Sequence, residues 1–188
     1  PTGPVFISLP GDILNTEAKI DLGSPTRIID SYRPSHNSIE LIAKKITKFN
    51  KPIIVVGHEV ASYDAFKEVA KFAELSGSAV YQQTVPHGSH FPSEHIAFMG
   101  ALPRLQNPTK KILENYDLLI CIGCDGLRMS VWNDTEPLPS KMPIIHIGIN
   151  EWEIGKNYFT ELAIIGNVKN TLHDINQYLK KTLTSKES

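Results

Sequence analysis

The chain has 188 residues, of which 41% are hydrophobic and 21% are charged, values that are ordinary for a globular protein. Its formal net charge of −1 gives no electrostatic argument for binding nucleic acid or an anionic membrane surface. No apolar run approaches the roughly 20 residues that a membrane-spanning helix needs, so we expect neither nucleic acid nor membrane as a partner.

The beginning of the sequence and its cysteine content bear on where the protein works. The first residues do not form the basic and then apolar segment of a secretory signal. Two cysteines in the whole chain fit a reducing compartment, so we expect a cytoplasmic protein. The chain begins at Pro1 rather than Met, which suggests a piece of a longer polypeptide.

The first 34 residues differ in pattern from the rest. Residues Gly3–Pro10 predict a short strand closed by proline. Residues 11–34 mix Gly, Pro, Asp and Ser without sustained periodicity, which is typical of a linker. We therefore predict the end of a preceding domain and a linker over 1–34, one α/β domain over 35–183, and a tail over 184–188.

From residue 35 onward, strand and helix patterns alternate. Ile39, Ile42, Ala43 and Ile46 share one face of a helix, and 52–57 is the continuous apolar run of a strand covered on both sides. In chain order the prediction is: helix 36–49, strand 52–57, helix from Phe66 to a stop at Gly77, strand 79–83, loop from Thr84 to about Leu105, helix 108–115, strand 117–123, loop 124–142, strands 144–149 and 163–165, and helix 168–182. The alternation predicts a Rossmann-like, doubly wound α/β fold with a parallel sheet.

In such a fold ligands bind in the crevice at the carboxyl ends of the strands. The residues expected to line it are Gly57, His58, Gly123, Cys124, Arg128 and Asn150. Arg128 is the best phosphate partner among them, although a surface salt bridge is the competing interpretation. The turn after the first strand lacks Gly-x-Gly-x-x-Gly, so ordinary NAD binding is not expected, and Glu59 would repel a diphosphate.

Two further groups of residues could suggest a metal or redox site. Cys121 and Cys124 have the Cys-x-x-Cys spacing, but the first lies inside a strand rather than at a helix start, so two buried thiols are the preferred interpretation. His87, His90 and His95 share one loop without the spacing of a rigid ligand set, so an ordinary polar loop is preferred. We expect no tightly bound zinc or iron.

Three segments resemble the thiamine-diphosphate-dependent enzymes of the acetolactate synthase and benzoylformate decarboxylase group. Glu153–Asn157 (Glu-Ile-Gly-Lys-Asn) with Ile165-Gly166 is similar to the end of that family's central domain, with departures at Asn150, Trp152 and Asn167. Residues 91–100 resemble the Phe-Pro-x-x-His-x-x-x-x-Gly loop of the family. Residues 3–13 are similar to the segment that ends the family's N-terminal, pyrimidine-binding domain.

The resemblance implies the central domain of a 2-oxoacid decarboxylase or carboligase, a lyase or transferase using thiamine diphosphate and Mg²⁺. Such a domain would have a six-stranded parallel sheet with helices on both faces. The family's Gly-Asp-Gly metal motif is missing, since Gly11-Asp12-Ile13 breaks it. The cofactor sites should therefore lie outside this chain, and no residue here receives a catalytic role.

The resemblance also implies partners and limits. Those partners are the pyrimidine- and diphosphate-binding domains of the same polypeptide, in a homodimer or homotetramer. The isolated chain should be inactive. FAD or ADP occupies this domain in some relatives, but neither is expected here. The alternative is a free-standing nucleotide-binding module without catalysis.

Overall fold

The computed structural model describes residues 4–26 and 31–184, and a six-stranded sheet lies at its centre. All strands run parallel in the order β3-β2-β1-β4-β5-β6. The strands are β1 (Pro52–Val56), β2 (Ala79–Gln82), β3 (Phe98–Ala101), β4 (Leu118–Ile122), β5 (Ile144–Gly148) and β6 (Leu162–Ile165). The predicted α/β fold with six parallel strands is confirmed, and strand order reverses direction between β1 and β4.

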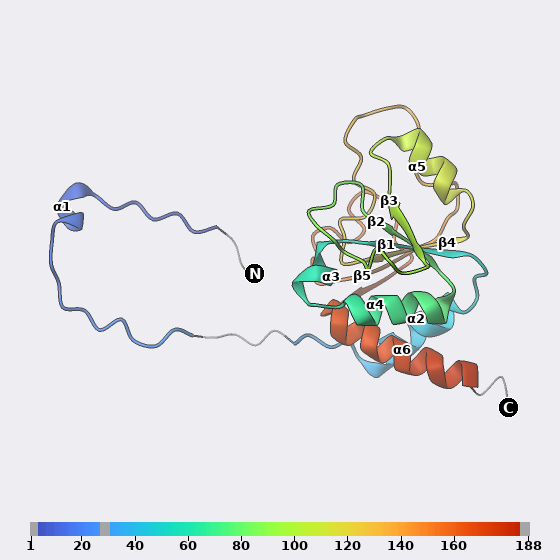
Figure 1. Cartoon of the computed structure of the whole chain (residues 1–188), viewed down its shortest axis with the longest axis horizontal. Coiled ribbons are helices and arrows are strands. Elements are labelled where there is room, and N and C mark those ends of the chain that lie inside the picture. The colour runs from blue at the N-terminus through green and yellow to red at the C-terminus, as the bar shows by residue number, and fades with distance from the viewer. Residues whose placement is uncertain (1–3, 27–30, 185–188) are drawn as a thin grey trace.

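Helices cover the two faces of the sheet unequally. On one face, α2, α4 and α6 pack against the strands and against one another, whereas α5 lies on the other face (Figure 1). The helices are α1 (Gly11–Leu14), α2 (His36–Ile46), α3 (His58–Ser62), α4 (Phe66–Ser76), α5 (Gln106–Leu113) and α6 (Val168–Thr184). Around α5, the irregular segment 124–142 completes the second face through Leu127 and Met142.

Local chemistry explains where several elements begin and end. Ser35 caps α2, because its hydroxyl accepts a hydrogen bond from the amide of Ser38 (3.2 Å). Gly77 ends α4 in the left-handed conformation, at φ 64°, as its predicted role as a stop requires. The Asp117 carboxylate accepts from the amides of Asn50 (2.8 Å) and Lys51 (2.9 Å), which aligns the starts of β1 and β4.

The strand predicted over 3–10 is wrong for residues 4–10, and Gly3 lies outside the described residues. Val5 and Phe6 are 84% and 92% exposed, and no described strand pairs with this segment. Residues 4–26 are exposed throughout and lead away from the sheet (Figure 1). An apolar alternation forms a strand only where a neighbouring strand can accept its hydrogen bonds. The short helix α1 lies inside the predicted linker.

Other differences concern element ends and one missed strand. The helix predicted over 36–49 ends at Ile46, the one predicted over 108–115 spans 106–113, and α3 was not predicted. The loop predicted from Thr84 to about Leu105 contains β3. This strand is four residues long, half-exposed and irregular in register against β2, with Gly100 at φ 99°. Such an edge strand has little of the apolar signal by which the other strands were found.

None of the helices in the described part of the chain has the length and apolar content needed to cross a bilayer.

The segment 84–97, which precedes β3, contains a core residue, Phe91. It is fully buried and stacks on Phe98 with ring centroids 6.0 Å apart. We predict that Phe91→Ala lowers the free energy of unfolding by about 3–5 kcal/mol, because it leaves a cavity beside the sheet. Phe159→Ala is the matched control, since that ring is 84% exposed; its effect should stay within about 0.5 kcal/mol. Urea denaturation measures both, and equal effects would show that the 84–97 segment does not belong to the core.

Candidate functional site

The carboxyl ends of β1 and β4 meet at the point where the strand order reverses, the usual ligand position of a doubly wound sheet. Gly57 follows β1, and its amide donates to the carbonyl of Ile122 (3.0 Å). A Cβ atom on Gly57 would lie 2.4 Å from Cys124 Cα and 2.5 Å from the Gly123 carbonyl oxygen. The two turns therefore touch through backbone, and position 57 has no room for a side chain.

Glu59 fills the space beyond these two glycines. Its side chain starts from α3, is only 5% exposed, and crosses the sheet edge to the end of β5. The amides of Ile149 and Asn150 donate to its two carboxylate oxygens at 2.9 and 3.3 Å. A Cβ on Gly123 would lie 2.6 Å from Glu59 Cβ, and one on Gly148 would lie 3.2 Å from Oε2. The carboxylate is thus enclosed by backbone on several sides.

The environment of Glu59 shifts its acidity. Burial raises the pKa of Glu59 above its ordinary value, because an ionised carboxylate loses hydration in this position. Hydrogen bonds from Ile149 and Asn150 and the nearby His58 oppose the shift, while Asp125 adds to it. Desolvation is the largest of these effects.

The predicted crevice residues divide into two groups. Gly57, Gly123 and Cys124 are buried and lie against one another. His58, Arg128 and Asn150 are exposed, and Asn150 faces the crevice through its backbone amide.

Arg128 forms a surface salt bridge, which was the alternative to a phosphate contact. Its Nη1 lies 2.9 Å from Asp125 Oδ2, and its side chain is 68% exposed. From the sequence, Glu59 was expected only as a repulsive charge, and its place inside the crevice was missed. The available signal was an acidic residue three positions after the end of the buried strand β1.

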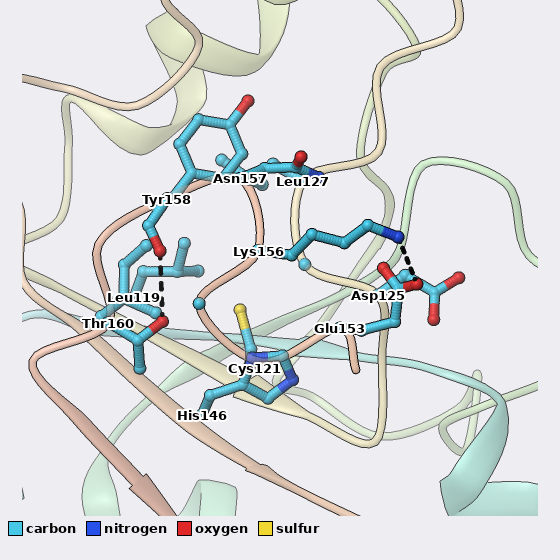
Figure 2. Close-up of a pocket in the computed structure, with 13 residues that line it drawn as sticks. Leu119, Cys121, Asp125, Leu127, His146, Glu153, Lys156, Asn157, Tyr158 and Thr160 are labelled. Carbon is cyan, nitrogen blue, oxygen red and sulfur yellow. Dashed lines mark hydrogen bonds and ion pairs between the residues drawn. The ribbon is translucent and has the colours of Figure 1, made fainter. Parts of the chain in front are cut away.

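A small cavity opens beside this crevice, on the α5 face of β4 and β5 (Figure 2). Its volume is about 20 Å³, enough for a water molecule and far too small for a nucleotide base. His146 lines it, with Nε2–H donating to the carbonyl of Cys124 (3.0 Å), and burial lowers the pKa of this histidine. Its other walls include Cys121, Asp125, Glu153, Lys156, Tyr158 and Thr160.

The segment 153–157 has a structural role at this cavity. Lys156 Nζ lies 2.9 Å from Glu153 Oε1 and 5.6 Å from the centre of the Trp152 ring. Gly155 between them has φ 69°, a conformation that side-chain-bearing residues rarely adopt. These contacts fold the segment into a cover over the cavity on β4 and β5.

A family model described as the thiamine pyrophosphate enzyme, central domain, matches residues 39–175. The chain belongs to this family. Its match includes the crevice and almost the whole sheet domain, so the resemblance expected from the sequence is confirmed.

Relatives and solved structures agree with this assignment. The chain is 33% identical to the acetolactate synthase large subunit of Corynebacterium glutamicum over 177 residues, which is 90% of this chain and 28% of that protein. It is 30% identical to acetolactate synthase of Mycobacterium leprae over 173 residues, 89% of this chain and 27% of that one.

Two solved structures share the fold at low sequence identity. The thiamine diphosphate-dependent 4-hydroxybenzoylformate decarboxylase of Rhodococcus jostii RHA1 aligns with a TM-score of 0.76 at 23% identity, over 82% of this chain and 29% of that one. Benzoylformate decarboxylase of Polynucleobacter necessarius aligns with a TM-score of 0.75 at 20% identity, over 86% of this chain and 30% of that one. The chain thus spans just under a third of the length of these proteins.

The two cysteines of the central domain are free and buried, as preferred from the sequence. Cys124 Sγ donates to the carbonyl of Val55 (3.4 Å). Hydrogen bonding with Cys124, together with burial, raises the pKa of the Cys121 thiol well above its usual range. A thiol that keeps its proton is a poor nucleophile and a poor metal ligand, so Cys121 contributes packing.

The three histidines of the 84–97 segment lie in different surroundings. His95 accepts from the amide of Ala97 at Nδ1 (3.2 Å), and its Nε2 faces Glu74 Oε1 at 3.4 Å. His90 is buried and burial lowers its pKa, whereas His87 is exposed. Among the residues that the structure describes, no three His, Cys, Asp or Glu side chains are placed to hold a metal ion.

The pH dependence of stability tests the environment of Glu59. Because its pKa is raised on folding, the carboxyl favours the folded state most below its ordinary pKa, and that contribution is lost as pH rises through the raised value. Glu59→Gln does not titrate. The free energy of unfolding of E59Q minus that of the wild type should therefore increase as pH rises across this interval.

Urea denaturation at a series of pH values measures the difference, in which all other titrating groups cancel. Glu151→Gln removes the same charge from an exposed side chain and serves as the control. A difference that stays level or falls with rising pH would contradict the assignment of a raised pKa to Glu59.

Proposed function

We propose that this chain serves as the structural centre of a longer thiamine-diphosphate-dependent 2-oxoacid decarboxylase or carboligase. Membership of the central-domain family supports the proposal, together with relatives about three times as long. Residues 1–34 would end the preceding domain and link it, 35–183 would form the central domain, and 184–188 would be a tail. Contacts between Arg33 and Asp174 (3.0 Å) and between Tyr32 and Asn167 would dock the linker on this domain.

The observation that favours a structural over a nucleotide-binding role is the buried Glu59 carboxylate. It occupies the crevice at the strand ends and accepts from the two amides that face it. A nucleotide phosphate would meet a negative charge there, and Arg128, the predicted cationic partner, is paired with Asp125. The crevice therefore favours the structural role over a free-standing nucleotide-binding module, and over FAD or ADP.

The residues that the structure describes do not fit thiamine diphosphate and its Mg²⁺. Magnesium needs a set of oxygen ligands around one point. Asp12, the acidic residue of Gly11-Asp12-Ile13, is exposed within the segment 4–26. The two backbone amides at the end of β5 already bind Glu59. We place the cofactor sites and the catalytic residues in the other domains of the polypeptide, in a cytoplasmic homodimer or homotetramer.

Calorimetric titration with thiamine diphosphate and Mg²⁺, with a decarboxylation assay on 2-oxoacids, tests this proposal. The 188-residue chain alone should neither bind the cofactor nor turn over substrate. The polypeptide extended to the full length of its relatives should do both. Binding of the cofactor or turnover by this chain alone would overturn the assignment, as would an inactive full-length polypeptide.

A further inference from the structure

Glu59 is an unusual residue to find inside a sheet domain. Among the residues that the structure describes, Glu59 is the one buried carboxylate. Its partners are the amides of Ile149 and Asn150 rather than a lysine or arginine side chain. Burying a carboxylate is unfavourable unless hydrogen bonds replace its hydration. The crevice therefore supplies donors that match a negative charge.

Those donors form a small anion site. Ile149 and Asn150 are consecutive, and both amides point at the same carboxylate. Successive backbone amides that converge on one point bind anions in many proteins. Around them the backbone of Gly123 and Gly148 leaves room for the glutamate but not for additional side chains. The geometry is that of a binding site whose occupant belongs to the chain itself.

We propose that Glu59 acts as a built-in ligand of this crevice and determines that the domain excludes phosphate groups. Its carboxylate takes the place that a phosphate would occupy against the Ile149 and Asn150 amides. Removal of the side chain should open a site for a small oxyanion, the phosphate of a nucleotide included. The inference concerns the crevice alone and holds whichever reaction the longer enzyme catalyses.

Occupation of the site and electrostatic repulsion alone predict different patterns of variants, because repulsion alone would let Glu59→Gln and Glu59→Ser bind anions equally well. Glutamine has nearly the shape of glutamate, so Glu59→Gln would keep the crevice filled while presenting one amide group to the donors of residues 149 and 150. Serine removes both the carboxylate and most of the volume. If Glu59 excludes anions by occupying their site, only the serine variant should bind them, although both variants lose the same charge.

The test is titration of the wild type, Glu59→Ser and Glu59→Gln with inorganic phosphate at constant ionic strength, with chloride as the balancing anion. Heteronuclear NMR follows the amide signals of Ile149 and Asn150, and calorimetry gives the affinity. We expect Glu59→Ser to bind phosphate at least about tenfold more tightly than the wild type or Glu59→Gln, equivalent to about 1.4 kcal/mol. The signals of residues 149 and 150 should shift on binding.

Glu151→Ser is the control for charge, because it removes one carboxylate from an exposed position on the same loop. It should bind phosphate no better than the wild type. If Glu59→Ser is unfolded, phosphate should restore its fold, because a ligand that binds only the folded state stabilises it. The proposal is overturned if Glu59→Ser neither binds phosphate more tightly than Glu151→Ser nor is refolded by it, or if the wild type binds equally well.

Discussion

The arrangement of this domain depends on the two hydrogen bonds that join the Glu59 carboxylate to the amides of Ile149 and Asn150. They connect the turn after β1 to the end of β5 across the intervening strand β4. The connection is feasible because Gly57 and Gly123 let the first two turns touch through backbone. Because the carboxylate has lost its hydration, losing a hydrogen-bond donor to it would be unfavourable. The loop after β5 is therefore held where its two amides meet the carboxylate.

At the same edge of the sheet, the segment 153–157, which resembles the family, lies in structural surroundings. Glu153, Gly155 and Lys156 shape the cover over β5 and the water-sized cavity, and they make no constellation suited to chemistry. Nearby Cys121 and His146 are buried, and burial favours the neutral form of each. This interior supports the structural role that we propose for the chain within a longer polypeptide, since the relatives are about three times as long.

Much of the fold could be predicted from the sequence, because buried strands such as 52–56 and 118–122 are continuous apolar runs, and helices such as 36–46 have one apolar face. The strand β3 could not, since a short, half-exposed edge strand carries little pattern. Residues 4–10 showed the opposite failure: they have the pattern but no described neighbouring strand. The glycines that follow strands predicted where the crevice lies. The contact between Glu59 and Ile149 could not be predicted, because the two residues are 90 positions apart in the sequence and meet only in the folded chain.

The most direct test of this account is a site-specific NMR titration of the Glu59 side-chain carboxyl carbon in the wild-type protein, with the amide protons of Ile149 and Asn150 followed in the same samples. We expect the carboxyl to titrate above the ordinary glutamate range and both amide signals to shift with the same midpoint, because these amides donate to that carboxylate. A carboxyl that titrates as a free glutamate does, with amide signals that do not follow it, would contradict the account.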